Sequence, residues 1–345
     1  MDWREQYRKK VVSAEEAVRT VRSGDVVVVT RHPPPRVLMD ALAARKKELR
    51  DVKVRAVAPA YDPGWFQPGW EESFSVTAEV FLGPVARPAY DERRMDYSPA
   101  IFSNQLKPYH ERPEELRAAD VLLVIVSPPD NNGFCRFGAN LWGKRRMARQ
   151  VQKVLAQVDD SFIRTYGTNF IHVSEIDRFV EYTPPKLSPG EAKALIERAV
   201  DVDAKVELER LLPHLSPQRQ AEVLPILVGF KADQVREFGR ARGLAEPSEE
   251  VRRIGEYVSE LVKDGDTIQL GIGTPSGYLA VMGAFDDKKD LGWHSEMGAR
   301  GVIRLIEAGV INGSRKTVNP GKAVFTGLDG CDTDEIAYAA DNPLI

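Results

Sequence analysis

Two short segments in the last quarter of the chain carry residue types that could catalyse acyl transfer. The first is Gln269-Leu-Gly-Ile-Gly-Thr-Pro-Ser276, in which a predicted strand enters a turn with glycines at 271 and 273. Because these glycines lack Cβ atoms, a ligand can approach the main chain, and the turn amides with a following helix N-terminus favour developing negative charge. The motif lacks the third glycine of a dinucleotide fingerprint and the Gly-Lys-Ser/Thr of a phosphate-binding loop. A plain tight turn between a strand and a helix is the alternative interpretation.

The second segment is His294-Ser-Glu-Met297, in which Glu296 is expected at a strand end. The carboxyl ends of neighbouring strands in an open α/β sheet line one crevice, so Glu296 and the amides of Gly271 and Gly273 could face the same ligand. A carboxylate placed there could attack a thioester carbonyl to form an anhydride, while the amides stabilise the oxyanion. From the pattern alone, an ordinary glutamate beside a loop is the simpler interpretation. The segment is not the zinc motif His-Glu-x-x-His, because no second histidine follows.

Two further polar segments are weaker candidates. Ser127-Pro-Pro-Asp-Asn-Asn-Gly-Phe-Cys135 follows an apolar run and could wall a pocket, although a rigid structural turn explains it equally well. His172-Val-Ser-Glu175 is typical of a strand end rather than a site. The five histidines give no metal-ligand pair at helical spacing, and there is no Gly-x-Ser-x-Gly nucleophile motif. We predict no metal.

The elements that must position these residues alternate between strands and helices. Three β-branched or apolar runs are predicted to be strands: 26–29, 52–57 and 121–126, the last buried on both faces. A capping box at Ser13 predicts a helix to about Arg22, and apolar spacing predicts another over 35–47. This alternation predicts an α/β fold.

A long-range similarity predicts two related domains. Val21-Arg-Ser-Gly-Asp-Val-Val-Val-Val29 and Leu261-Val-Lys-Asp-Gly-Asp-Thr-Ile-Gln-Leu270 each end a helix with Gly-Asp and enter a strand, and each strand leads to a proline-containing turn and an apolar helical stretch. A common supersecondary junction is the alternative explanation. Between the copies, 184–247 is rich in charged residues and leucine, with caps at Ser188 and Pro217 and no strand pattern. We therefore expect an α/β domain over 1–183, a helical insert over 184–247, and a second α/β domain over 248–345.

Composition narrows the class of protein. The 345 residues carry 48 basic and 51 acidic side chains, and the net charge of −3 gives no electrostatic case for nucleic acid. No apolar run is long enough to span a membrane, and the first residues do not resemble a signal peptide, so we expect a cytoplasmic protein. Cys135 and Cys331 are far apart and in no CxxC pattern, which favours packed thiols over a disulfide or zinc site.

Several collinear motifs together resemble one known family. They are Met1-Asp-Trp3, Ser13-Ala-Glu-Glu-Ala-Val18, the 126–135 loop, Phe170-Ile-His-Val-Ser-Glu-Ile-Asp177, Gln269-Leu-Gly-Ile-Gly273 and His294-Ser-Glu-Met297. This set resembles the acetyl-CoA hydrolase/transferase family, among the family I CoA-transferases. The likeness covers most of 1–183 and 249–345 and skips the helical insert.

The resemblance implies a ping-pong transfer of CoA from an acyl-CoA to a small carboxylic acid, with Glu296 as the nucleophile and no permanently bound cofactor. It implies that Gln269, Gly271 and Gly273 hold the acyl and oxyanion groups. From their places in the sequence, we also expect Ser127, in the loop after a predicted strand, and His32, in the loop over 30–35, to contribute to acyl or CoA binding. The loop Thr30-Arg-His-Pro-Pro-Pro35 is bulkier than the resemblance predicts and is expected to shape the acyl pocket. Only Thr274 separates Gly273 from Pro275, where two residues are usual in the family, so we expect a modified oxyanion turn.

Family members continue through a further glycine-rich segment beyond the position of Ile345. We therefore expect an incomplete second domain, completed by a second polypeptide in a hetero-oligomer that covers unpaired sheet edge and apolar surface. The alternatives are an acyl-CoA hydrolase in which water replaces the acceptor, a noncatalytic or regulatory relative, and, more remotely, a nicotinamide-dependent enzyme.

Overall fold

The structure is a computed structural model that describes residues 2–31, 33–102, 111, 119–271 and 273–345. It divides into two compact units. The N-terminal unit comprises Met1–Phe162 and Gly167–Thr183, and the C-terminal unit comprises Ile163–Tyr166 and Pro184–Ile345. The helices of the predicted insert therefore group with the C-terminal strands.

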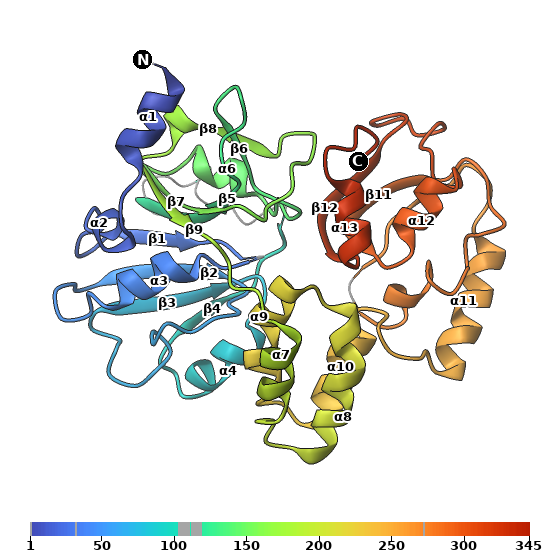
Figure 1. Cartoon of the computed structure of the whole chain (residues 1–345), viewed down its shortest axis with the longest axis horizontal. Helices are drawn as coiled ribbons and strands as arrows, with labels where there is room; N and C mark the ends of the chain where they lie inside the picture. The colour runs from blue at the N-terminus through green and yellow to red at the C-terminus, as the bar shows by residue number, and fades with distance from the viewer. Residues whose placement is uncertain (1, 32, 103–110, 112–118, 272) are drawn as a thin grey trace. The chain divides into compact units, whose positions relative to one another are not determined.

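The N-terminal unit is built on a seven-stranded parallel sheet of order β4-β3-β2-β1-β5-β7-β9 (Figure 1). Its strands are β1 Val26–Val29, β2 Val52–Val57, β3 Phe74–Glu79, β4 Asp96–Ser98, β5 Val121–Val126, β7 Lys153–Asp159 and β9 Arg178–Tyr182. All three predicted strands are confirmed, and β5 is buried along its whole length as expected for a central parallel strand. The predicted α/β class is confirmed.

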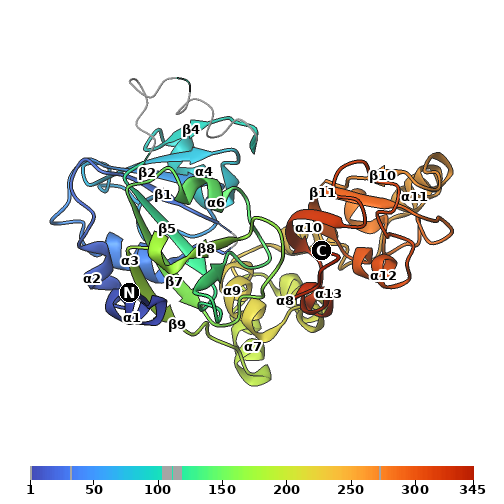
Figure 2. The same cartoon turned by 90° about the horizontal axis from the view of Figure 1, so that it is seen from above.

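Two layers cover this sheet, as can be followed in Figure 2. One face packs against α2 (Ala14–Val18), α3 (Arg36–Ala43) and α4 (Gly83–Asp91). The other packs against α1 (Trp3–Lys10), α6 (Lys144–Ala148) and the two-stranded antiparallel sheet of β6 (Phe134–Arg136) and β8 (Phe170–His172). The first two predicted helices are shorter than expected, because the chain turns at residues 19–20 and 44–48 to return to the sheet.

The C-terminal unit begins with helices that have their own apolar core. They are α7 (Pro189–Ile196), α8 (Val202–Leu211), the 3-10 turn η3 (Leu212–His214), α9 (Pro217–Leu227) and α10 (Ala232–Arg240). Leu208, Leu224 and Val235 lie at the centre of that core. The predicted caps are confirmed: Ser188 forms a capping box with Glu191, and Pro217 occupies the first turn of α9. Residues 184–247 contain no strand.

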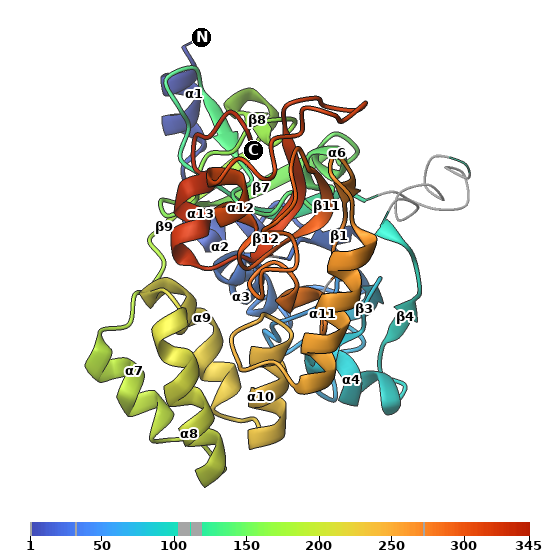
Figure 3. The same ribbon diagram turned by 90° about the vertical axis from the view of Figure 1, so that its right-hand side faces the viewer.

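The unit continues into a three-stranded parallel sheet of order β10-β11-β12. Strands β11 and β12 of this sheet are labelled in Figure 3. The elements are α11 (Glu249–Leu261), β10 (Thr267–Ile268), the 3-10 turn η4 (Ser276–Tyr278), β11 (Gly292–Ala299), α12 (Val302–Glu307), β12 (Ala323–Gly330) and α13 (Thr333–Ala339). The fully buried side chains of Tyr278, Phe285 and Trp293 pack in this part of the chain.

The predicted repeat is visible in the hydrogen bonds at the starts of β1 and β10. Asp25 and Asp266 each follow a glycine with positive φ, at +80° and +87° respectively. Each carboxylate accepts the amide of the residue three positions earlier, at 2.8 and 2.9 Å. Each aspartate carbonyl then accepts an amide of the neighbouring strand, from Lys53 of β2 and Gly292 of β11. The order β3-β2-β1 of one unit thus has its counterpart in the order β12-β11-β10 of the other.

Candidate active site

Glu296 lies inside β11 (Gly292–Ala299), the central strand of the C-terminal sheet, and not at the strand end that the sequence predicted, because the pairing with β12 continues beyond it to Ala299. It is half-buried, between buried Ser295 and Met297, while His294 is exposed. Because β10, β11 and β12 are parallel, their carboxyl ends share one edge, and the segment that leaves β10 at this edge is the predicted glycine turn. The structure therefore places Glu296 and the turn from Gln269 to Gly273 on adjacent strands.

A serine connects these two segments directly. The Ser295 hydroxyl accepts a hydrogen bond from the Leu270 amide at 3.2 Å and donates one to the Leu270 carbonyl at 3.0 Å. Leu270 lies between Gln269 and Gly271, so Gln269, Gly271 and Gly273 are brought together with Glu296 in one unit. The sequence pattern missed this serine, since nothing in its spacing distinguishes it from any other strand residue.

The glycine turn presents its main chain to open space. An added Cβ at Gly271 or at Gly273 would meet nothing within 4 Å. Gly273 has φ +114°, a conformation that L residues rarely adopt, whereas Gly271 has no such constraint. Gln269 and Gly271 are exposed and Gly273 is half-buried. There is therefore room beside the backbone of the turn, and the binding of a ligand there stays a prediction.

The prediction of a helix after the glycine turn is wrong. Only the 3-10 turn η4 forms there, and irregular turns follow to residue 287. Close packing explains this, because Gly277 sits against the backbone of Ala241, where an added Cβ would lie 3.2 Å from the carbonyl oxygen. A single 3-10 turn has little macrodipole, so charge stabilisation at this site must come from individual amides rather than a helix N-terminus.

The ends of β11 and β12 are closed by an acidic cluster that was not singled out in the sequence. Asp332 and Glu335 form the capping box of α13, and a Glu335 oxygen also accepts the Gly301 amide at 2.6 Å. Burial raises the pKa of Glu335, and the hydrogen bonds from the Asp332 and Gly301 amides offset part of this rise. Next to the cluster, the thiol of Cys331 lies so close to Gly298 that a Cβ there would meet it at 2.7 Å. The Asp332-x-x-Glu335 spacing was a readable capping signal.

Ser127 lies in the N-terminal unit, at the end of β5. Its side chain is buried, and its hydroxyl donates to the Pro128 carbonyl and accepts the Arg136 amide, both at 2.9 Å. These bonds tie the 127–135 loop to β6. The role of Ser127 in CoA or acyl binding stays a prediction. His172 ends β8 as expected, and its ring caps the 3-10 turn η2 (Val173–Glu175).

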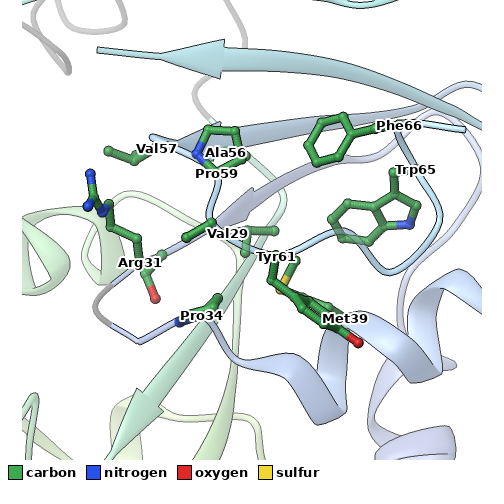
Figure 4. A pocket seen from close by; sticks show the side chains of 12 residues that line it. Val29, Arg31, Pro34, Met39, Ala56, Val57, Pro59, Tyr61, Trp65 and Phe66 are labelled. Atoms are coloured by element: carbon green, nitrogen blue, oxygen red, sulfur yellow. The ribbon is translucent and has the colours of Figure 1, made fainter. Parts of the chain in front are cut away.

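A small pocket lies at the carboxyl ends of β1 and β2 in the N-terminal unit (Figure 4). Its volume is about 10 Å³, room for about one water molecule, because Tyr61, Trp65 and Phe66 fill it. The Tyr61 hydroxyl donates to Asp40 at 2.7 Å, and burial together with this bond raises the pKa of Tyr61 to about 12. Arg31 of the predicted pocket loop also lines it, while His32 lies outside the described residues.

The described residues provide neither a membrane span nor a metal site. No helix in this part of the chain is long and apolar enough to cross a bilayer. No group of three histidine, cysteine, aspartate or glutamate side chains is placed to hold a metal ion within the same described ranges. Both cysteines are free and buried, as the sequence predicted.

Comparison with known proteins gives consistent matches. Residues 1–189 match the family described as acetyl-CoA hydrolase/transferase N-terminal domain. The chain is 30% identical to 4-hydroxybutyrate coenzyme A transferase of Clostridium kluyveri, over 100% of this chain and 67% of that protein. It is 29% identical to succinyl-CoA:cyclohexane-1-carboxylate CoA transferase of Geobacter metallireducens, over 94% of this chain and 60% of that protein.

Solved structures show the same fold. RipA from Yersinia pestis superposes with a TM-score of 0.74 at 23% identity, covering 100% of this chain and 68% of RipA. The 4-hydroxybutyrate CoA-transferase from Porphyromonas gingivalis gives 0.62 at 24% identity, again covering 100% of this chain and 68% of that one. The chain thus spans 60% to 68% of the length of these four proteins.

Proposed function

Because the chain belongs to the acetyl-CoA hydrolase/transferase family, we propose that it is the catalytic chain of a CoA-transferase with Glu296 as its nucleophile. Its substrates are an acyl-CoA and a small carboxylic acid, with no permanently bound cofactor and with the cytoplasm as its location. The observation that carries the proposal is the attachment of the glycine turn to the strand of Glu296 through Ser295. The names of the relatives, all CoA transferases, agree with it.

The proposed reaction proceeds through two covalent intermediates. A carboxylate oxygen of Glu296 attacks the thioester carbonyl, the carbon–sulfur bond breaks, and CoA leaves as the thiolate with a mixed anhydride on the enzyme. The thiolate then attacks the glutamyl carbonyl of the anhydride and releases the first carboxylate, which leaves a glutamyl-CoA thioester. The acceptor carboxylate attacks this thioester, and the same steps in reverse give a new acyl-CoA and free Glu296.

The glycine turn supplies the second part of the chemistry. Each tetrahedral intermediate places negative charge on the former carbonyl oxygen, and backbone amides aimed at that oxygen stabilise it without reorganisation. The open space at Gly271 and Gly273 lets an acyl group reach those amides. We assign Gln269, which is exposed at the start of the turn, to hold the acyl group.

We further propose that a second polypeptide completes the C-terminal sheet. In the N-terminal unit β1 pairs with β2 on one side and β5 on the other, whereas its counterpart β10 pairs only with β11 among the described residues. Helix α11, which leads into β10, exposes Ile254, Tyr257 and Leu261, and the last is 75% exposed. A parallel strand docked beside β10, as β5 lies beside β1, would cover this apolar stripe and satisfy the free strand edge.

The test is a transfer assay with butyryl-CoA as donor and labelled acetate as acceptor, run with the chain alone and with candidate second polypeptides. Glu296→Ala should lower the transfer rate by on the order of 10³-fold or more, because it removes the nucleophile. Glu307→Ala, on the exposed side of α12, is the matched control and should keep the wild-type rate.

Equal rates for wild type and Glu296→Ala would refute the proposal. Release of free CoA at the same rate with and without acetate would instead identify an acyl-CoA hydrolase. If no preparation acts on any acyl-CoA, the chain is a noncatalytic relative and not a CoA-transferase.

A further inference from the structure

Two serine hydroxyls hold the glycine turn from opposite ends. Ser295, 4% exposed, bonds to both the amide and the carbonyl of Leu270. The backbone pairing of β10 with β11 ends at Ile268 and Trp293, so this hydroxyl continues the attachment where the ladder stops. Since Ser295 directly precedes Glu296, the bond fixes the start of the turn relative to the proposed nucleophile.

Ser276 holds the other end of the turn. Its hydroxyl is shared between the Gly271 carbonyl at 2.8 Å and the Gly273 carbonyl at 3.0 Å. The Gly273 carbonyl also accepts the Gly277 amide at 2.9 Å. Two carbonyls of the turn are therefore directed toward the Ser276 side.

This arrangement determines which way the next amide points. In a trans peptide the C=O and the following N–H point in opposite directions. The Gly273–Thr274 peptide is trans, so the Thr274 N–H points away from Ser276. Within the described part of the chain no backbone carbonyl accepts it. Thr274 is an exposed residue, and a Cβ added at the neighbouring Gly273 would meet no atom within 4 Å.

We propose that Ser276 and Ser295 are positioning residues for the reaction at Glu296, and that they turn the Thr274 amide outward to bind the acyl oxygen. The inference rests on the proposed function and adds residues that the glycine pattern did not include. Their effect is on geometry: a displacement of about 1 Å in a reacting site can cost about 100-fold in rate. We expect Ser276→Ala and Ser295→Ala each to lower kcat by about 10- to 100-fold, with KM for acyl-CoA changed less than about threefold.

The first experiment does not depend on turnover. Hydrogen exchange of the full chain, read by mass spectrometry, should show faster exchange of the Leu270 amide in Ser295→Ala and of the Gly277 amide in Ser276→Ala. Ser188→Ala, which removes a helix cap in the insert, is the matched control and should leave both amides unchanged. Unchanged exchange of these amides in the two site variants overturns the inference.

The second experiment measures the rate at which butyryl-CoA forms the glutamyl-CoA adduct, in the preparation that is active in the transfer assay. Ser276→Thr keeps a hydroxyl and should recover most of the rate lost in Ser276→Ala. Wild-type adduct rates in both alanine variants overturn the positioning role. A wild-type protein that turns over without any adduct at Glu296 instead overturns the proposed function, so the two failures are distinguishable.

Discussion

Gly271→Ala separates binding at the turn from stability of the fold. Gly271 has no positive φ, and its added methyl group would meet no protein atom within 4 Å. We therefore expect the free energy of unfolding to stay within about 0.5 kcal/mol of wild type, as for an exposed site without special geometry. The same methyl group occupies the space through which an acyl group would reach the turn amides.

The effect on catalysis follows from that steric displacement. A methyl group holds the substrate oxygen away from its donors by an ångström or more, which predicts a fall in kcat/KM of about 10- to 100-fold. Gly273→Ala is expected to differ, because its φ of +114° is strained for alanine and costs of order 1 to 3 kcal/mol of stability as well. Gly190→Ala, also with no atom within 4 Å of the added Cβ, is the control for both.

The assays are chemical denaturation followed by circular dichroism, and steady-state transfer of CoA from butyryl-CoA to acetate. A stable Gly271→Ala protein with reduced kcat/KM supports the reasoning. Wild-type kcat/KM in Gly271→Ala, together with inactivity of Glu296→Ala, would show that substrate does not approach the turn backbone. That result would refute stabilisation of the oxyanion by the turn amides but would leave Glu296 as the nucleophile.

Three further predictions concern the wider chain. Burial raises the pKa of Glu335 above its ordinary 4.5, so the stability that this group contributes is present below pH 4.5 and is lost as the pH rises through the folded pKa. Glu335→Gln should therefore make the free energy of unfolding fall less steeply above pH 4.5. Equal slopes in wild type and variant would contradict this. Burial raises the pKa of Cys135 to about 12 and the pKa of Cys331 well above its ordinary value. Neither thiol should therefore react with a disulfide reagent at pH 8 until the chain unfolds. Rapid reaction of either thiol in the folded chain would be inconsistent with its burial. Phe66 is 5% exposed and packs in the core of the N-terminal unit, so Phe66→Ala should lower the free energy of unfolding by about 3 to 5 kcal/mol in chemical denaturation, and a loss below about 1 kcal/mol would contradict this packing.

The parts of the fold that were predictable from sequence are those set by local interactions. The Gly-Asp junctions before β1 and β10 could be matched because each is closed by a bond from the aspartate to an amide three residues earlier. The continuous apolar run of β5 predicted burial on both faces of the strand, and all six residues of β5 are buried. The family was identifiable for the same reason, since its motifs are short and collinear.

The parts that were not predictable depend on contacts between distant segments. The apolar spacing of 278–282 indicated a helix, but packing of Gly277 against Ala241 ended it after one 3-10 turn. Ser295 gave no signal, because its partner Leu270 is 25 positions away in the sequence. Tyr61, Trp65 and Phe66 lie in an irregular loop, and only the tertiary fold brings them against the ends of β1 and β2.

Identifying the covalent intermediate tests most directly whether Glu296 is the nucleophile. The chain, with its second polypeptide where one is required, is incubated with butyryl-CoA, treated with hydroxylamine or borohydride, and mapped by peptide mass spectrometry. We expect a modification at Glu296 that appears only with acyl-CoA and is absent in Glu296→Ala. Modification of another residue, or full turnover with Glu296 unmodified throughout, would contradict it.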